Sequence, residues 1–412
     1  MKVLYCPAYF FPEQAASSSL NNQRNQAFVD AGFDIVVYVP TPCRGVTKDE
    51  RETYCSKEHR HEKLYDGKML VNRFSMYSEG KNPVLRALRY SLCWLKQFNR
   101  GLCEKYVNCI YIASTPPIQG VLGGMLKKIK KVPFVYNLQD IFPDSLVGTG
   151  LAKKDGLLWE IGRRIENFTY RNADKIIVIS QDFKRNIMAK GVPEEKIEVV
   201  YNWVDENAIT PVRDEENELF EEFGISRDKF RVVYAGNLGN AQNIEIIVNA
   251  ARRLKDNKQI EFIIFGKGGL EDEIKAAKTK EQLDNLKILP LQPYERVAKV
   301  YGLGHLCIVA CKPGLGGAAM PSKTWSIMSS GRAVLANFDE GELKEIVENN
   351  HCGVFTKSDD LEGFVQSIKE LSQQPERCAE MGVNGRQFIM ENLTREVGTQ
   401  KYVDVIKSVV KQ

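Results

Sequence analysis

The sequence predicts an α/β protein with two domains, each built on a parallel β-sheet that has helices on both faces. Three observations lead to this fold class. The chain has 412 residues, which is enough for two separate cores. Short apolar segments alternate with helical patterns along both halves. Between the halves, residues 203–229 are acidic and lack strand signals, so they are interpreted as a connection.

The first half contains apolar strand segments separated by amphipathic ones, as a doubly wound sheet requires. The predicted strands are VLYC (3–6), DIVVYV (34–39), NCIYIA (108–113), PFVYNL (133–138), KIIVIS (175–180) and IEVVYN (197–202). The predicted helices lie near residues 17–31, 83–105, 118–130, 155–172 and 181–190.

The second half repeats the alternation. Its predicted strands are RVVYAG (231–236), IEFIIFG (260–266), LKILP (286–290), HLCIVA (305–310) and AVLANF (333–338). We therefore expect an N-terminal domain over residues 1–205 and a C-terminal domain over residues 206–394. The last helical stretch, about 395–412, has no strand after it, and we expect it to pack back on the N-terminal domain. Two sheets of this kind bind ligands in a cleft, at the carboxyl ends of their strands.

The composition is that of an ordinary water-soluble protein, with 43% hydrophobic and 27% charged residues. No segment has the length and apolar character of a membrane span, and the first ten residues look like a buried strand rather than a signal peptide. The ten cysteines are scattered singly, which favours buried thiols in a reducing cytosol over disulfides or a zinc site. The four histidines make a histidine-rich metal site unlikely to be present.

The net charge of +4 is unevenly distributed. Residues 1–205 carry 30 Lys and Arg against 22 Asp and Glu, a balance of +8, and the remaining residues carry 27 against 31, a balance of −4. A basic first half suggests an anionic partner. Nucleic acid is not favoured, because the basic residues form no groove interleaved with aromatic ones.

Three glycine-rich turns follow strands of the second half, and each precedes a helical pattern. Glycine lets the backbone approach a ligand closely, and helix N-termini present unpaired N–H groups to anions. One such turn is more often only a turn, whereas three in one sheet, two of them with lysine, favour a phosphate-bearing ligand. The turns are VYAGNLGNAQNIE (233–245), FIIFGKGGLEDEI (262–274) and PGLGGAAMPSKTW (313–325).

Several segments together resemble a known enzyme family. They are QDIFPDSLVGTG (139–150), RNADKIIVIS (171–180), GVPEEKIEVVYNWVD (191–205), YAGNLGNAQ (234–242) and PSKTWSIMSSGRAVLA (321–336). Their order resembles family 4 of the retaining glycosyltransferases and, within it, the bacterial polysaccharide branch that includes N-acetyl-L-fucosamine and fucosyl transferases. The resemblance covers nearly the whole chain and implies the GT-B fold, in which two Rossmann-like domains face each other across an interdomain cleft.

The resemblance also implies an activity. Such an enzyme moves a sugar, here an N-acetylated amino sugar or a 6-deoxy sugar, from a nucleotide-diphosphate donor, with UDP the expected nucleotide, to a saccharide on a polyprenyl diphosphate. The anomeric configuration is retained, and the product belongs to a capsule, O-antigen or exopolysaccharide. Negative charge grows on the departing diphosphate, so aimed dipoles and a cation lower the barrier without a protein nucleophile. No cofactor and no essential metal are expected.

The residues that the resemblance assigns lie on both halves. Asp140 and Lys323 are the expected catalytic residues. The expected donor-binding residues are Gln14, Ala15, Ala16, Gly236, Asn237, Leu238, Gln242, Gly266, Lys267, Gly268, Gly316, Gly317, Pro321, Ser322, Lys323 and Ser326.

The sequence departs from the family where two glutamates, with seven residues between them, usually contact the donor sugar and the ribose. Those positions hold Ala318 and Ser326, and the PSK element is expected to replace the first glutamate. Basic residues that usually face the diphosphate correspond to Asn237 and Gln242. Lys323 would therefore supply most of the positive charge, with Lys267 as a helper; alternatively, Lys323 is a solvated lysine at a helix start.

Two further loops have open alternatives. The loop at 10–22 occupies the place of a glycine pair that approaches the donor phosphate in relatives, and it is alternatively a plain connection capped by Ser17 or Ser18. Asp140 follows the strand at 133–138 and is expected to orient the acceptor hydroxyl or the transferred sugar. The alternative role is a helix cap, which we assign to Asp144.

The acceptor side is expected to meet a membrane. Residues 82–101 form an amphipathic helix with apolar residues from Val84 to Phe98 on one side and Arg86, Arg89, Lys96 and Arg100 on an adjacent stripe. A second basic cluster is KKIKK (127–131). Such a pattern fits an anionic bilayer surface, and it equally fits a helix that faces the core with a solvated basic flank. We expect a cytoplasmic protein, peripheral at the inner face of the plasma membrane.

Two other functions stay open. A sugar-nucleotide 2-epimerase shares the architecture, although its chemistry needs acid and base groups that the histidine-poor turns offer sparsely. A non-catalytic nucleotide-sugar-binding subunit is consistent with the two missing glutamates.

Overall fold

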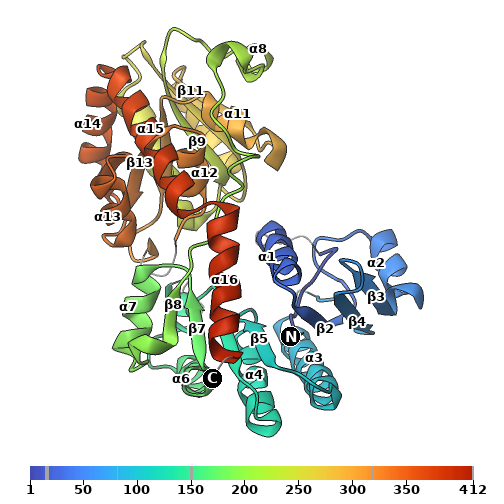
Figure 1. The fold of residues 1–412 in the computed structure, drawn as a ribbon. Helices are drawn as coiled ribbons and strands as arrows, with labels where there is room; N and C mark the ends of the chain where they lie inside the picture. Colours follow the sequence, from blue (N-terminus) through green and yellow to red (C-terminus); the bar gives the residue numbers. More distant parts are fainter. Residues whose placement is uncertain (14–17, 81, 149–151, 317–319, 411–412) are drawn as a thin grey trace. The chain divides into compact units, whose positions relative to one another are not determined.

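The computed structural model describes residues 1–13, 18–80, 82–148, 152–316 and 320–410, which form two compact units. The first unit comprises Met1–Tyr201 together with Glu396–Gln412, and the second comprises Asn202–Arg395 (Figure 1). Each unit has a β-sheet flanked by helices, so the predicted α/β class with two parallel-sheet domains is confirmed. Within the described residues, no helix is both long enough and apolar enough to cross a bilayer.

The first unit contains an eight-stranded sheet in the order β3-β4-β2-β1-β5-β6-β7-β8. All neighbouring strands run parallel except β3 and β4, which are antiparallel. The strands are β1 (Lys2–Tyr5), β2 (Asp34–Pro40), β3 (His61–Leu64), β4 (Met69–Phe74), β5 (Cys109–Ala113), β6 (Phe134–Leu138), β7 (Lys175–Val178) and β8 (Ile197–Val199).

The β3–β4 hairpin was not predicted, because its sequence is too polar. β3 reads HEKL, and no residue of it is fully buried since it lies at the edge of the sheet. The connecting turn places Tyr65, Asp66 and Gly67 at positive φ, the conformation that tight hairpin turns require. In contrast, β2, β5 and β6 are buried along most of their length and consist mainly of apolar residues.

Helices cover both faces of this sheet, and their ends follow local signals. Asn82 caps α3 by accepting hydrogen bonds from the Val84 and Leu85 amides, with a proline at the first helical position. The helices are α1 (Ser18–Asp30), α2 (Lys48–Cys55), η1 (Glu58–Arg60), α3 (Pro83–Cys103), α4 (Ile118–Lys130), α5 (Asp144–Gly148), α6 (Leu157–Asn172), α7 (Gln181–Ala189), η2 (Glu194–Lys196) and α16 (Arg395–Val410).

The C-terminal helix α16 belongs to the first unit from Glu396 onward. Its Tyr402 is buried, and the Tyr402 hydroxyl donates to Asn137 Oδ1 on β6 at 3.1 Å. The amide of Asn137 in turn donates to the Tyr111 hydroxyl, which also accepts from Arg24. These buried bonds join α16 to the middle of the sheet (Figure 1).

The second unit contains a six-stranded, all-parallel sheet in the order β11-β10-β9-β12-β13-β14. Its core is a continuous cluster of buried aliphatic and aromatic side chains from the strands and from the flanking helices. The strands are β9 (Phe230–Asn237), β10 (Ile260–Lys267), β11 (Leu286–Pro290), β12 (Leu306–Ala310), β13 (Ala333–Phe338) and β14 (Gly353–Lys357). The helices are η3 (Asp214–Glu216), α8 (Leu219–Glu222), η4 (Asn240–Gln242), α9 (Ile244–Arg253), α10 (Glu271–Glu281), η5 (Tyr294–Arg296), α11 (Val297–Gly302), α12 (Lys323–Ser329), α13 (Glu342–Asn349), α14 (Leu361–Ser372) and α15 (Pro375–Asn392).

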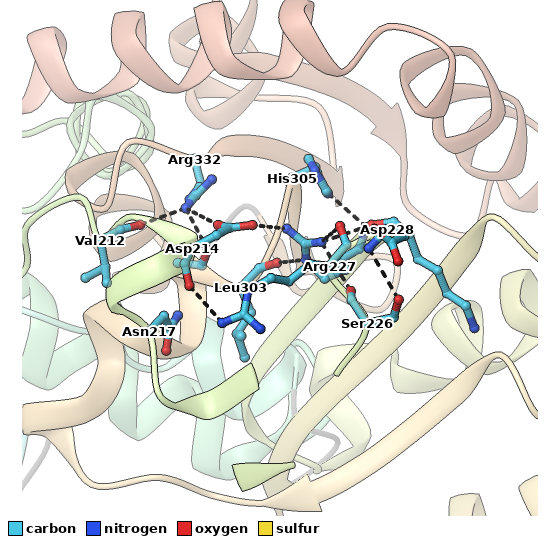
Figure 2. A network of polar contacts seen from close by, with 12 residues as sticks. Val212, Asp214, Asn217, Ser226, Arg227, Asp228, Leu303, His305 and Arg332 are labelled. Carbon is cyan, nitrogen blue, oxygen red and sulfur yellow. Dashed lines mark hydrogen bonds and ion pairs between the residues drawn. The ribbon is translucent and has the colours of Figure 1, made fainter. Parts of the chain in front are cut away.

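A buried polar network holds the connecting segment onto the amino end of this sheet (Figure 2). Arg231, at the start of β9, is 1% exposed, and its guanidinium pairs with Asp214 at 2.7 Å. Arg332 donates to the Val212 carbonyl at 3.0 Å and lies 3.6 Å from the second oxygen of Asp214. The carboxylate of Asp214 is therefore shared by two arginines, which fixes residues 212–214 against the sheet.

His305 closes the same network in its neutral form. Its Nδ1 accepts the Arg231 N–H at 3.0 Å, so that nitrogen carries no proton. Burial, helped by the positive charges of Arg231 and Arg332, lowers the pKa of His305 from 6.5 to about 4.

The second unit should consequently lose stability as the pH falls from about 6.5 to about 4. In this window His305 is protonated in the unfolded chain and neutral in the folded chain. The free energy of unfolding should therefore be lower by roughly 2 kcal/mol at pH 5 than at pH 8 through this group. The free energy of unfolding in urea, measured at pH 8 and pH 5, checks this. The His305→Asn variant keeps a hydrogen-bond acceptor that does not titrate, so its free energy of unfolding should decrease between pH 8 and pH 5 by about 2 kcal/mol less than that of the wild type. Equal decreases in both proteins would contradict the neutral state assigned to His305.

Candidate functional site

The glycine-rich turns lie together at the carboxyl edge of the second sheet. β9 and β10 are in register there, with Gly236 opposite Gly266 and Asn237 opposite Lys267. The loop after β12 is tied to the loop after β9, because the Lys312 amide donates to the Ala241 carbonyl at 2.9 Å. The edge therefore has the position at which parallel sheets bind ligands.

Lys323 reaches this edge from the first position of α12. Its Nζ donates to the Tyr234 hydroxyl at 3.0 Å and lies 4.1 Å from the centroid of the Tyr234 ring. The Tyr234 hydroxyl donates its proton to the Asn237 carbonyl at 2.7 Å, so it acts only as an acceptor toward Lys323. A Cβ added at Gly236 would lie 3.1 Å from Nζ, which shows how closely the ammonium approaches the bare backbone of β9.

No carboxylate among the described residues neutralises the ammonium of Lys323. Among the described residues, none of the ion pairs involves Lys323. Burial lowers the pKa of Lys323 from 10.5 to about 8, so the lysine is mostly protonated at neutral pH. A partly buried cation with a hydroxyl, an aromatic face and no counter-charge among the described residues suits an anion.

The second turn plays a packing role that the sequence did not reveal. A Cβ at Gly266 would lie 2.6 Å from the Leu238 side chain, and one at Gly268 would lie 2.5 Å from the Leu238 carbonyl oxygen. Leu238 is fully buried, and its N–H donates to the Lys267 carbonyl at 3.0 Å. Gly266 and Gly268 therefore admit the neighbouring turn, and Leu238 presents neither its side chain nor its amide to a ligand.

Lys267 lies beside negative charge. The helix α10 that follows this turn begins with Glu271, Asp272 and Glu273, whose carboxylates already face its positive end. Lys267 itself is exposed and lowers the pKa of Glu271, although Lys275 contributes more to that shift. A diphosphate would meet repulsion at this helix start, whereas α12 has no acidic residue in its first turn.

The remaining predicted donor residues fall into two groups. Asn237 and Gln242 are partly accessible on the first turn, with their amide groups 3.5 Å apart. Pro321, Ser322 and Ser326 surround Lys323 at the start of α12. In the third turn, the Gly316 amide donates to Asp339 Oδ2 at 2.8 Å, so it is already occupied. Gln14, Ala15, Ala16 and Gly317, together with Ala318, lie outside the described residues.

In the first unit, Asp140 follows β6 at the carboxyl edge of the sheet. Its Oδ2 accepts a hydrogen bond from the Ser145 hydroxyl at 3.1 Å. Desolvation raises the pKa of the Asp140 carboxyl above its ordinary value, although the Ser145 bond acts in the opposite direction. Asp144 begins α5 and pairs with Lys190 at 2.8 Å, which differs from the cap expected for it.

The Asp140 loop is held by a buried ionic network. Lys190 bridges Asp144 and Glu166, with the Glu166 contact at 2.9 Å. Glu166 also pairs with Arg163 and accepts from the Tyr170 hydroxyl at 2.7 Å. Because these groups come from α5, α6 and α7, the network fixes the segment that carries Asp140.

The helix α3 carries an exposed apolar row, formed by Val84, Leu85, Leu88, Leu92 and Leu95. These side chains are between 37% and 73% exposed, which is unusual for aliphatic residues at successive helical turns. One expectation about this helix is wrong. Arg89 was expected on a solvated stripe but is fully buried, with its Nε donating to the Tyr77 carbonyl at 3.0 Å.

The predicted basic cluster at 127–131 is partly neutralised. Lys127 pairs with Asp174 at 2.6 Å, and Lys130 donates to the Leu102 and Glu104 carbonyls at the end of α3. Lys128 lies over the Phe168 ring at 4.9 Å. Most of this cluster therefore holds α4 to its neighbours.

Tyr234 is the residue of the candidate site that was missed. Its signal was present, because strand residues two apart share a face, and Tyr234 precedes Gly236 by two positions. No pattern in the sequence, however, connects Tyr234 with Lys323, which is 89 residues further along the chain.

Comparison with known proteins identifies both halves. Residues 25–208 match the family model described as Glycosyltransferase Family 4, and residues 215–388 match the model described as Glycosyl transferases group 1. WbjE of Pseudomonas aeruginosa, named as a glycosyltransferase, is 23% identical over 83% of both chains. WcaI of Escherichia coli strain K12, named for colanic acid biosynthesis, is 26% identical over 69% of this chain and 70% of its own.

Solved structures show the same fold. Sucrose-phosphate synthase from Thermosynechococcus elongatus has a TM-score of 0.76 with 14% identity, and each chain is covered completely. HepE from Anabaena, crystallised in complex with UDP, has a TM-score of 0.72 with 18% identity over 99% of this chain and all of its own.

The two glycines of the second turn allow a matched test of its packing. Gly268→Ala should lower the free energy of unfolding by about 1–3 kcal/mol, because the new methyl group would overlap the Leu238 backbone. Gly269→Ala meets no atom within 4 Å and should change it by less than about 0.5 kcal/mol. Urea unfolding measures both, and equal effects would contradict the packing role.

Proposed function

Because the chain belongs to the family 4 glycosyltransferases of the GT-B fold, we propose that it transfers a sugar, with retention of configuration, from a UDP-linked donor to a saccharide on a polyprenyl diphosphate. The donor sugar is an N-acetylated amino sugar or a 6-deoxy sugar, as in N-acetyl-L-fucosamine and fucosyl transferases. The product is a precursor of a capsule, O-antigen or exopolysaccharide. HepE, a structural neighbour solved with UDP and with UDP-glucose, and WcaI, named for colanic acid biosynthesis, support this reading.

One observation carries the proposal. Lys323 is a buried ammonium without a carboxylate among the described residues, at the carboxyl edge of a nucleotide-binding type of sheet. A diphosphate supplies the missing negative charge. Since the donor keeps part of this charge before reaction and gains more as its sugar departs, the lysine stabilises the transition state more than the ground state.

The proposed reaction needs few side chains. The bond between the anomeric carbon and the diphosphate oxygen breaks, and its electron pair stays on the diphosphate beside Lys323. The acceptor oxygen forms the new bond on the same face of the sugar, and its proton passes to the departing phosphate. Asp140 orients the acceptor hydroxyl or the transferred sugar. This scheme requires no metal ion.

We further propose that the first unit binds the inner face of the plasma membrane, where a polyprenyl-linked acceptor resides. The α3 apolar row supports this, since leucines exposed along one side of a helix can enter the interface between head groups and acyl chains. Arg86 and Lys96 flank the row, and Lys131 remains exposed at the end of α4.

Replacing Lys323 by methionine should raise the dissociation constant for UDP at least tenfold and reduce the turnover about a hundredfold, because the methionine keeps the stem and removes the charge. Isothermal titration calorimetry measures the first effect. The wild-type affinity should also fall as the pH rises through about 8, where Lys323 loses its proton. Lys267→Met is the control, and its dissociation constant for UDP should stay within about threefold of the wild-type value. An unchanged UDP affinity in Lys323→Met would refute the proposal.

Asp140→Asn should lower the rate of sugar transfer at least about tenfold while thermal unfolding stays unchanged, because the amide keeps the shape and loses the charge. Transfer from a radiolabelled UDP-sugar to membrane extract gives the rate. Asp155→Asn, an exposed aspartate of the same unit at positive φ, is the control and should behave as the wild type. Wild-type turnover in Asp140→Asn would remove Asp140 from the reaction.

The double variant Leu88→Gln, Leu92→Gln should reduce binding to phospholipid vesicles at least about tenfold, because two inserted apolar side chains are lost. Vesicle co-sedimentation measures the bound fraction. Leu291→Gln together with Val383→Gln removes two equally exposed apolar residues from the second unit and should have no effect. Binding that survives in the α3 variant would refute the membrane role of the row.

A further inference from the structure

A basic depression lies beside α3 in the first unit. It has a volume of about 820 Å³ and is bounded by β2, the β3–β4 hairpin, η1 and the second half of α3. Its lining includes Arg60, Lys96 and Arg100 and the polar side chains of His61 and Asn99. No carboxylate is among the residues that line it in the described part of the chain.

The positive charge of this depression is not neutralised locally. Lys96 and Arg100 lie one helical turn apart and both face the Phe74 ring, at 5.7 and 4.7 Å from its centroid. Lys96 donates only to the Ser75 carbonyl. Neither Arg60 nor Arg100 has an ion pair among the described residues. Three cations thus share one concave surface without a counter-charge.

Arg73, the fourth cation of the lining, differs from the other three because its charge is already neutralised. Arg73 is buried and pairs with Glu62, and its second nitrogen donates to the Phe11 carbonyl at 2.6 Å. Glu104, which directly follows α3, accepts from Tyr38 and pairs with Lys2 at 3.0 Å. Glu62 and Glu104 are therefore already committed to other partners, and the three remaining cations are available to an external anion.

The depression adjoins the α3 apolar row. Leu92 and Leu95 precede Lys96 and Asn99 by four residues each, so they occupy the same side of the helix one turn earlier. A helix that inserted these leucines into a bilayer would hold the depression at the level of the lipid phosphates.

We propose that this depression binds the phosphate of an anionic phospholipid head group. The inference rests on the proposed membrane contact of the first unit and adds the chemistry that the surface recognises. Arg60 and Arg100 present planar guanidinium groups that can bind phosphate oxygens in pairs, and Lys96 adds a point charge. Asn99 can donate hydrogen bonds to the glycerol or head-group oxygens.

Co-sedimentation with two kinds of vesicle tests the site. Wild-type protein should bind vesicles of phosphatidylcholine and phosphatidylglycerol at least about tenfold more tightly than vesicles of phosphatidylcholine alone, and added salt should remove the difference. The triple variant Arg60→Gln, Lys96→Gln, Arg100→Gln should bind both kinds equally. The control Lys255→Gln, Lys258→Gln, Lys280→Gln removes the same charge from the exposed surface of the second unit and should bind as the wild type.

A second variant guards against loss of folding in the triple variant, since two of its residues pack on Phe74. Asn99→Asp leaves every packing group in place and adds a carboxylate to the depression. It should lower the preference for phosphatidylglycerol, and Asn99→Ser should not. If the triple variant and the Asn99→Asp variant both keep the wild-type preference for phosphatidylglycerol, the inference is overturned. The proposed membrane role of the α3 apolar row would still stand.

Inorganic phosphate distinguishes a lipid from a water-soluble source. If phosphate raises the Tm of the wild type but not of Asn99→Asp, and vesicle binding ignores phosphatidylglycerol, then the site takes a soluble phosphate and the lipid assignment is wrong. If the Leu88→Gln, Leu92→Gln variant binds vesicles as the wild type does, the membrane proposal and this inference both fall. UDP binding by Lys323 is measured separately and does not depend on either result.

Discussion

The candidate donor site depends on a cation that the fold desolvates without neutralising. Moving an ammonium out of water costs several kcal/mol unless other groups replace its hydration. For Lys323 the replacement is partial: the Tyr234 hydroxyl gives one hydrogen bond and the Tyr234 ring gives a cation–π contact of about 1–2 kcal/mol. The lowered pKa of Lys323 reflects the part of the lost hydration that these contacts do not replace. An anion with two or three charges would restore the balance, and we propose the end of β9 as the place where it binds.

The strand β9 therefore serves two purposes at its two ends. At the carboxyl end, Tyr234 and Gly236 orient Lys323 and leave the backbone bare beside it. At the amino end, Arg231 and His305 fasten the connecting segment through Asp214. At the amino end the Asp214 carboxylate compensates the buried charge of Arg231, whereas at the carboxyl end none of the described carboxylates pairs with Lys323. Stability and ligand binding are thus separated by the length of one strand, as is usual in parallel sheets.

Prediction from the sequence succeeded where a single segment decides the outcome. The strands predicted at 231–236 and 333–338 became β9 and β13, because a strand buried on both faces consists mostly of apolar residues. Prediction failed where contacts with a segment distant in the sequence determine the role of a residue. Gly266 and Gly268 were interpreted as ligand contacts, yet they accommodate Leu238 of the neighbouring turn. Arg89 looked like part of a solvated stripe, but the Tyr77 carbonyl draws it into the interior. The PSK lysine was found from its motif, and only the coordinates connect it with Tyr234.

The return of α16 to the first unit means that the polypeptide crosses between the units twice, once near residue 201 and again near residue 395. A cut near residue 201 would leave the second unit covalently attached only to α16, whereas a cut near residue 395 would release α16 alone. The first unit expressed by itself would need residues 396–412 supplied in cis or in trans, since Tyr402 completes the hydrogen bonding of Asn137 inside the sheet. The second unit, in contrast, is one continuous segment, Asn202–Arg395, between the two parts of the first unit, so it can be expressed and studied as a separate fragment.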